Sequence, residues 1–176
     1  MSTTNNSSTT LPVLQTVATT TIQLTRGYVT VVDTIDSDFA KLKWFAYQSH
    51  GILYARRNSP NRKTLHLHRV ILIRMLGRDL ADSEYCDHIN GDGLDNRRSN
   101  LRLATHAENE CNQRRHSNNT SGYKGVSLHK ATQKWRASIS INGIRKHLGL
   151  FDTAQDAYGA YCEAALKLHG EFARFE

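Results

Sequence analysis

A strict alternation of apolar and polar residues constrains the fold more than any other feature of this sequence. In the segment 134–141, Lys-Trp-Arg-Ala-Ser-Ile-Ser-Ile, every second residue is apolar, which is the pattern of a strand with one buried face. Asn142-Gly143 follows directly and is typical of a two-residue hairpin turn, so residues 144–150 are expected to form the return strand. An earlier strand is expected at 123–128.

A helix is expected behind this hairpin. Thr153 and Asp156 are spaced like an N-terminal capping pair, and Gly170 suits the C-terminal cap. Between them the apolar residues recur at helical spacing: Ala154, Ala157, Tyr158, Tyr161, Ala164, Ala165 and Leu168. The pattern predicts a three-stranded antiparallel sheet packed on one helix. Trp135 shares the buried face with Ala137 and Ile139, so it is predicted to be a core residue.

The charge of the chain is concentrated in the same region. The formal net charge is +7, and residues 118–150 contain six basic and no acidic residues. An excess of this kind indicates a polyanionic partner, and a basic, twisted sheet can enter the major groove of DNA. The alternative is an ordinary solvated sheet face, which the periodicity does not exclude. The outward residues are Arg136, Ser138, Ser140, Arg145 and His147.

The sequence of this module resembles the Apetala/ethylene-response-factor DNA-binding domain over about residues 118–175. The matching stretches are Tyr123-Lys124-Gly125-Val126, Lys134-Trp135-Arg136-Ala137, Leu148-Gly149, Phe151-Asp152-Thr153-Ala154, Ala157-Tyr158 and Ala160-Tyr161. The resemblance implies DNA contacts at Lys124, Ser127, His129, Arg136, Ser138, Ser140, Arg145 and His147. Several of these positions are Arg or Trp in the plant factors, so the target sequence cannot be transferred.

The first half of the chain predicts a small β-rich unit that leads into a helix. Strands are expected at 28–32, 43–47 and 52–56, because these runs are rich in β-branched and aromatic residues. The segment 65–76 begins with strand-like alternation and continues with helical spacing, and the helix is expected to end near Gly77. Residues 1–21 are rich in Ser, Thr and Asn and are expected to be largely disordered.

A group of polar residues in the middle of the chain has the composition of a hydrolytic site. Asp87 and His88 come at the end of an expected strand, before the tight loop Asn90-Gly91-Asp92-Gly93, and Thr105-His106-Ala107-Glu108 is a capping box that opens a helix carrying Asn109. The oxygens of Asp87 and Asn109 suit a hard divalent cation, and a histidine can deprotonate water near neutral pH. Neighbouring strand residues point to opposite faces, however, which argues against one shared site for Asp87 and His88.

Two simpler interpretations of this group compete with the hydrolytic one. Asp87 and Asn96 could cap turns, with His88 a surface loop residue. A calcium-binding EF-hand loop is excluded, because His88 and Ser99 occupy its first and twelfth positions.

These residues resemble the HNH endonucleases of the phage and intron homing type. The stretches are His68-Arg69-Val70, Asp87 through Asp92, Asn96-Arg97, Asn100-Leu101 and Glu108-Asn109, within a resemblance that covers roughly residues 22–115. The spacings agree with those of the family's motif, with 12 residues from His88 to Asn100 and 21 from His88 to Asn109. In this chain Asn replaces the last His of the motif. The resemblance implies a ββα-metal fold, which places Asp87 and His88 around one ion.

The same resemblance implies a role for each site residue. His88 would be the general base, Asp87 and Asn109 the ligands of one Mg²⁺ (or Mn²⁺), and Asn100 the residue that braces the loop. Apart from the resemblance, the positive charges of Arg97, Arg98 and Arg102 suit flanking phosphates, and the alternative is that these loop arginines are simply solvated. The cysteines that bind zinc in some family members are absent, so Cys86 and Cys111 are expected to be small buried side chains.

Together these features predict an α+β chain with a nuclease core and a DNA-binding module. The expected boundaries are 1–21 for a disordered tail, 22–115 for the HNH nuclease domain with its β-rich N-terminal part, 116–121 for a flexible linker and 122–176 for the DNA-binding domain. We expect a site-specific endonuclease that leaves 5′-phosphate and 3′-hydroxyl ends on double-stranded DNA. One site per chain suits a monomer or weak dimer, and whether one or both strands are cut stays open.

Two other functions remain possible at this point. One is a sequence-specific DNA-binding regulator with an inactive nuclease-like scaffold, and the other is a general nucleic-acid binder without cleavage. Apolar runs are too short for a membrane span, and three cysteines do not form a disulfide framework. The chain is therefore expected in the cytoplasm, which would be that of the host cell if a phage encodes it.

Overall fold

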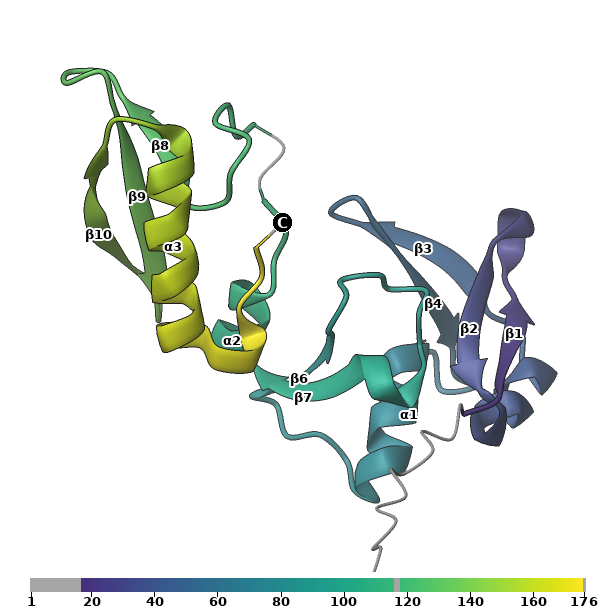
Figure 1. Ribbon diagram of the computed structural model, residues 1–176. Coiled ribbons are helices and arrows are strands. Elements are labelled where there is room, and N and C mark those ends of the chain that lie inside the picture. The colour runs from purple at the N-terminus through teal and green to yellow at the C-terminus, as the bar shows by residue number, and fades with distance from the viewer. Residues whose placement is uncertain (1–16, 116–117, 176) are drawn as a thin grey trace, which may run out of the picture.

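The computed structural model describes residues 17–115 and 118–175, which form two lobes of mixed helix and strand (Figure 1). The expected α+β class is confirmed. The elements of the first lobe are β1 (Thr19–Gln23), η1 (Thr25–Gly27), β2 (Val29–Asp33), η2 (Thr34–Lys41), β3 (Phe45–Ser49), β4 (Ile52–Asn58), β5 (Thr64–His66), α1 (Leu67–Leu76), β6 (Glu84–His88), η3 (Arg98–Asn100), β7 (Leu101–Thr105) and α2 (His106–Cys111). Those of the second lobe are β8 (Val126–His129), β9 (Lys134–Ile141), β10 (Ile144–Phe151), α3 (Ala154–His169) and η4 (Gly170–Phe172).

The β-rich start of the first lobe has a small apolar core. β1 pairs antiparallel with β2, and β3, β4 and β5 form a three-stranded antiparallel sheet. Trp44 is almost fully buried, and its indole N–H donates to the Phe39 carbonyl at 2.9 Å, so the ring fits into the core without an unpaired polar group. The other fully buried apolar residues of this core are Ile22, Val32, Ala55, Leu67 and Ile71.

At the N-terminal end of this lobe, part of the tail expected to be disordered forms a strand. β1 starts at Thr19, so the last three residues of the segment expected to be disordered lie in a strand that pairs with Val31–Asp33. A run of three threonines favours a strand because their β-branched side chains suit a pleated surface. Residues 1–16 of the expected tail lie outside the described residues.

The switch from strand to helix expected in the segment 65–76 is present. β5 ends at His66, α1 begins at Leu67, and Gly77 ends the helix with a left-handed φ of 66° and an N–H that donates to the Ile73 carbonyl. This helix packs against β4, β6 and β7, and it therefore supports the strand pair of the candidate site from behind.

The candidate site is carried by a strand–loop–strand–helix unit. β6 pairs antiparallel with β7, with Asp87 opposite Arg102 and His88 opposite Leu101. α2 follows β7 directly, because Thr105 accepts a hydrogen bond from the Glu108 N–H while Glu108 accepts one from the Thr105 N–H. The capping box thus fixes where α2 leaves the sheet.

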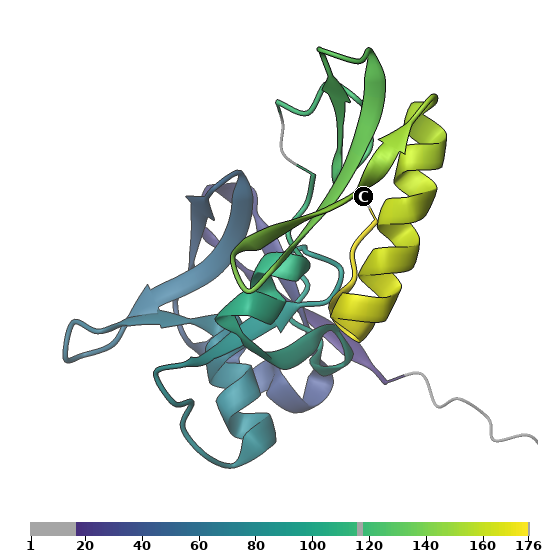
Figure 2. The same ribbon diagram turned by 90° about the vertical axis from the view of Figure 1, so that its left-hand side faces the viewer.

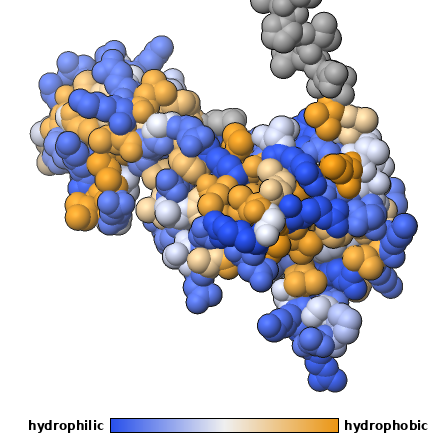
Figure 3. Space-filling model, turned by 90° about the horizontal axis from the view of Figure 1, so that it is seen from below, coloured by the Kyte–Doolittle hydropathy of each residue, from blue (hydrophilic) through white to orange (hydrophobic). Residues whose placement is uncertain are grey.

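The second lobe is the predicted sheet with one helix. The strand order is β10-β9-β8, and α3 lies along one face of the sheet (Figure 2). Asn142 and Gly143 both have positive φ, 50° and 76°, as the hairpin turn between β9 and β10 requires. Ala137 and Ile139 are buried under α3, and Trp135 is half-buried against the same cluster. Seen from below, Figure 3 shows the same two lobes, with apolar and polar side chains mixed on their surfaces.

Part of the expected flexible linker is a hydrogen-bonded turn. The Asn119 amide donates to the Tyr123 carbonyl at 2.9 Å, and the Ser121 hydroxyl contacts the Val126 carbonyl at the same distance. Residues 116–117 lie outside the described residues. Within the described part of the chain, no helix is both long and apolar enough to cross a membrane.

Candidate nuclease site and DNA-binding sheet

Asp87 and His88 lie at the end of β6 and are both buried, with exposed fractions of 4% and 6%. Their side chains have different hydrogen-bond partners, as expected for neighbours on a strand. Asp87 contacts β7 and the end of α2, whereas His88 contacts the loop that follows β6.

The Asp87 carboxylate is held on two sides. The Arg102 Nε donates to its Oδ2 at 2.8 Å, and the Asn112 Nδ2 lies 2.9 and 3.1 Å from its two oxygens. The same Asn112 Nδ2 donates to the His88 carbonyl at 2.8 Å, which fixes the orientation of the amide because a carbonyl can only accept. Asn112 therefore holds Asp87 in place.

Asn109 does not make this contact. It lies within α2, half-buried, and its side chain forms no hydrogen bond among the described residues. Asn112 was missed by the sequence analysis, although one signal was available. Residues three apart lie on the same side of a helix, so Asn112 at the C-cap points in the same general direction as Asn109.

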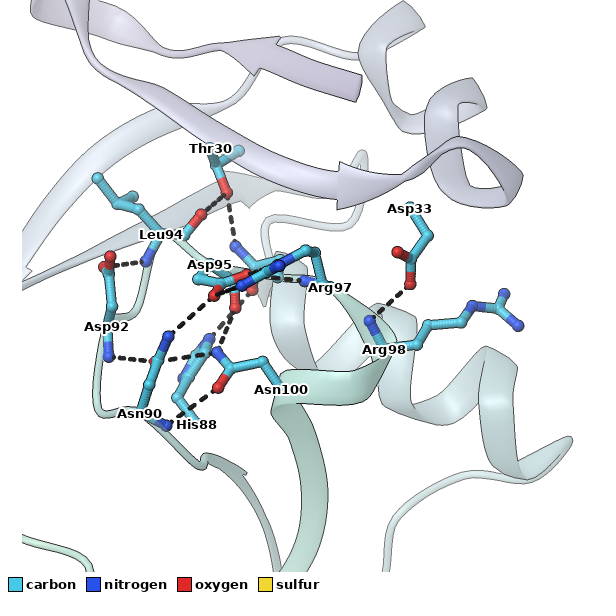
Figure 4. A network of polar contacts seen from close by, with 11 residues as sticks. Thr30, Asp33, His88, Asn90, Asp92, Leu94, Asp95, Arg97, Arg98 and Asn100 are labelled. Atoms are coloured by element: carbon cyan, nitrogen blue, oxygen red, sulfur yellow. Dashed lines mark hydrogen bonds and ion pairs between the residues drawn. The ribbon is translucent and has the colours of Figure 1, made fainter. Parts of the chain in front are cut away.

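His88 is oriented by Asn96, which belongs to the stretches that resemble the HNH motif but for which the sequence predicted no role beyond a turn cap. The His88 Nε2 lies 3.2 Å from the Asn96 Oδ1. The Asn96 Nδ2 donates to the Thr30 hydroxyl at 2.7 Å, and this hydroxyl donates to the Leu94 carbonyl at 2.6 Å (Figure 4). The Asn96 oxygen thus faces His88, so Nε2 carries the proton and Nδ1 is the basic nitrogen.

Burial favours the neutral form of His88. It lowers the pKa of the imidazole below its usual range, although the hydrogen bond with Asn96 and the charge of Asp87 oppose this effect. The ring of His68 packs edge-on against His88, with 4.9 Å between centroids, and Tyr54 lies on the same side. Burial and the neighbouring His88 hold the pKa of His68 well below its usual value. His88 is thus a neutral base in a tightly packed pocket.

Asn100 bridges the two ends of the loop between β6 and β7. Its Nδ2 donates to the Asp95 carbonyl at 2.7 Å and to the Asn90 Oδ1 at 3.0 Å, and its Oδ1 accepts from the Asn90 N–H (Figure 4). This is the geometry of a brace, because a single side chain ties together residues on both sides of the turn.

The three arginines expected to hold phosphates form internal ion pairs. Arg97 binds Asp95 through two nitrogens, at 2.7 and 2.6 Å. Arg98 binds the fully buried Asp36. Arg102 binds Asp87. These contacts stabilise the loop and the strands, and in this arrangement the guanidinium groups are committed to carboxylates.

Asp87 and Asn109 carry oxygen donors of the kind that a hard cation takes. Asp87 offers a buried carboxylate at the end of β6 and Asn109 an amide oxygen on α2, and such oxygens suit Mg²⁺ or Mn²⁺ when water and phosphate complete the shell. The Asn112 amide turns its nitrogen, not its oxygen, towards Asp87. In residues 17–115 and 118–175 there is no group of three or more His, Cys, Asp or Glu side chains that could hold an ion. Burial raises the pKa of Cys86 to about 12, which favours the protonated thiol over the thiolate that binds metals.

The residues expected to contact DNA gather on the outer face of the second sheet. The register sets Ser127 opposite Arg136, Ser138 opposite His147 and Ser140 opposite Arg145. A shallow hollow of about 360 Å³ lies on this face and is lined by His129, Arg136, Ser138, Arg145, His147 and Leu150.

Lys124 lies away from this face. Its Nζ donates to the carbonyls of Cys111 at 2.8 Å and Gln113 at 2.7 Å, at the end of α2. Burial lowers its pKa to about 8. The structure thus places Lys124 at the junction of the two lobes.

Family models match both lobes. A model described as HNH endonuclease matches residues 65–111, and one described as AP2 domain matches residues 121–171. The chain belongs to the HNH endonuclease family and carries an AP2 domain after the nuclease region.

Curated relatives agree with this assignment. Protein 3.8 of Escherichia phage T7 is 37% identical over 91 residues, which cover 52% of this chain and 74% of the phage protein. An uncharacterised HNH endonuclease of Acanthamoeba polyphaga mimivirus is 34% identical over 135 residues, 76% of this chain and 66% of the viral protein. APETALA2-like protein 2 of rice (indica) is 41% identical over 51 residues, 29% of this chain and 12% of the rice protein. No solved structure matches the chain.

Proposed function

We propose that this chain is a site-specific DNA endonuclease in which His88 is the general base and the outer face of the second sheet holds the target. The observation that carries the proposal is the fixed orientation of His88. Asn96 binds its Nε2, which leaves the basic Nδ1 to take a proton from water, and Asp87, the preceding residue on β6, supplies a buried carboxylate.

The residues of the chain divide the work of hydrolysis between them. His88 takes the proton of the attacking water, and Asn100 keeps the loop in place while it does so. Asp87 and Asn109 would hold one Mg²⁺ or Mn²⁺, with Asn112 fixing the carboxylate of Asp87. When bound, such an ion polarises the scissile phosphate and stabilises the leaving oxygen. The products are a 5′-phosphate and a 3′-hydroxyl.

The sheet supplies binding and selectivity. Arg136 and Arg145 neutralise phosphates or reach guanine edges, and the hydroxyl groups of Ser138 and Ser140 are suited to base or phosphate contacts. The chemistry of the face, basic and polar with no acidic residue in the segment 118–150, suits a DNA duplex.

The experiment that tests this function is cleavage of supercoiled plasmids that carry a random library of inserts. We expect conversion to open-circle or linear DNA with Mg²⁺ and none with EDTA, and His88→Ala should remove the activity while DNA binding remains. Binding is measured in the same samples. Binding to a defined sequence without any cleavage would instead favour a DNA-binding regulator with a nuclease-like scaffold.

A further inference from the structure

The chain that follows α3 returns to the nuclease lobe. Gly170 ends α3 with a left-handed φ of 53°, and the short turn η4 then lies beside α2 (Figure 1). Phe172 and Arg174 in this segment are each only 7% exposed. A terminal segment with buried side chains makes specific contacts with its surroundings.

The first of these contacts leads to Asp87. The Arg102 Nη1 donates to the Glu171 carbonyl at 2.6 Å, and the Arg102 guanidinium stacks on the Phe172 ring at 3.7 Å from its centroid. The Nε of the same guanidinium donates to Asp87. One side chain therefore joins the candidate metal ligand to the end of the DNA-binding domain.

Two further contacts lie at other points of the junction. Lys124 binds the carbonyls at the end of α2, and the His169 Nδ1 lies 2.7 Å from the Cys111 Sγ. Arg174 packs against the active-site loop, where a Cβ at Gly91 would lie 3.0 Å from the Arg174 Cζ and would overlap its Nη1. The two lobes are thus joined at β7, at α2 and at the loop, and three separate contacts restrict rotation as well as translation.

The junction also has a surface suited to DNA. A hollow of about 500 Å³ lies between the lobes, and its lining includes Arg114 and Arg115 after α2 and Arg136 and Arg145 on the sheet. A phosphate backbone that runs from the sheet towards the nuclease site meets basic side chains from both lobes along this path.

We propose that the C-terminal segment 170–175 docks the AP2 domain on the nuclease lobe in one position, and so sets the distance between the bound sequence and the cut. This inference rests on the proposed function. A flexible tether would let the nuclease reach a range of phosphates, whereas a docked module presents a single one. Arg102 is a positioning residue in this arrangement, because it acts on the site through Asp87.

The test maps the cut on a duplex that contains the sequence selected by the wild-type protein. Three variants of the full chain are compared: four Gly/Ser residues inserted between Ser117 and Asn118, the double substitution Phe172→Ala with Lys124→Ala, and Leu166→Ala on the exposed side of α3 as a matched control. The cut is mapped to the nucleotide, and DNA affinity is measured in parallel.

We expect the insertion and Leu166→Ala to leave the cut at the wild-type nucleotide. The double substitution should spread cutting over several nucleotides while the affinity changes by less than about 3-fold. A cut that moves with the inserted length, or a double variant that keeps a single wild-type cut, overturns the inference alone. A wild-type protein that binds its selected duplex and never cuts overturns the proposed function as well.

Discussion

At the scale of single residues, the candidate site depends on amides that hold the groups proposed to react. Asn96 is completely buried and orients His88, and Asn112 holds Asp87. Neither residue has chemistry of its own in the proposed reaction. Their importance comes from the protonation state and direction that they impose on the two groups that react.

Replacing Asn96 tests this role. Asn96→Ala leaves the His88 Nε2 without its partner, so we expect the cleavage rate to fall by about 10-fold or more, but by no more than the roughly 10²–10⁴-fold that a general base contributes. The lost hydrogen bond should also lower the free energy of unfolding by about 1–3 kcal/mol. Single-turnover cleavage and urea unfolding measure the two effects. Asn61→Ala, the same change at an exposed turn, is the control, and an unchanged rate in Asn96→Ala would refute the role.

The two asparagines near the end of α2 are predicted to behave differently. Asn109→Asp keeps an oxygen ligand, so cleavage should persist with a changed Mg²⁺ dependence. Asn112→Asp replaces the donor to Asp87 with a second carboxylate about 3 Å away, so cleavage should fall by at least 100-fold. Cleavage rates over a Mg²⁺ titration make the comparison. Equal tolerance of the two substitutions would contradict the assignment.

The sequence could single out Asp87, His88 and Asn100 as candidate site residues but not most of their contacts. Motif spacing is local, whereas Arg98 pairs with Asp36 and Asn96 with Thr30, 62 and 66 residues away along the chain. Local patterns carry no information on such pairs. For the same reason the sequence did not show that Arg98 pairs with Asp36, whereas the partner of Arg97, Asp95, is only two residues away along the chain.

At the scale of elements, turn and cap chemistry made much of the fold predictable. The Thr105 capping box, the Asn142-Gly143 turn and the Gly77 cap all specify their structures within a few residues, and each is present. β1 and η2 were not predicted. β1 has a short, weakly apolar sequence and owes its strand conformation to pairing with β2, while η2 packs Phe39 into a core built by distant segments.

The capping box offers a test at this scale. Thr105→Ala should lower the free energy of unfolding by about 0.5–2 kcal/mol and reduce cleavage, because α2 carries Asn109 and Asn112. Thr105→Ser keeps the hydroxyl and should restore most of both properties. Chemical unfolding and cleavage rates are the measurements. Full activity in Thr105→Ala would show that the start of α2 does not position the site.

The packing of α1 against the site predicts a pH-dependent stability. Burial lowers the pKa of His68 and of His88, so the unfolded chain binds more protons than the folded chain below pH about 6.5. The free energy of unfolding should therefore keep its full value above this pH and fall as the pH decreases towards 5. His68→Gln should reduce the slope of the free energy of unfolding against pH by up to about 1.4 kcal/mol per pH unit. Urea unfolding between pH 5 and 8 measures it, with His50→Gln on the exposed hairpin as the control; an unchanged slope in His68→Gln would contradict the prediction.

At the scale of the whole molecule, the proposed function divides binding and cutting between two lobes. Arg145 lies on the outer face of the sheet, whereas Lys124 is bound within the junction. Arg145→Ala should weaken DNA binding and reduce the slope of log affinity against log salt by about 1, and Lys124→Ala should leave that slope nearly unchanged. Titrations at several salt concentrations measure both slopes. The reverse result would mean that DNA contacts the junction and not the sheet.

The proposed function requires one chain both to select a DNA sequence and to cut it with His88. The most direct measurement is single-turnover cleavage of a duplex containing the selected sequence, by wild type and His88→Ala, with Mg²⁺, with Mn²⁺ and with EDTA. We predict metal-dependent cleavage by the wild type, and a loss of at least 100-fold in His88→Ala with the affinity for the duplex retained. Cleavage by His88→Ala at the wild-type rate, or a wild-type protein that binds the duplex tightly and leaves it intact with either ion, would contradict the claim.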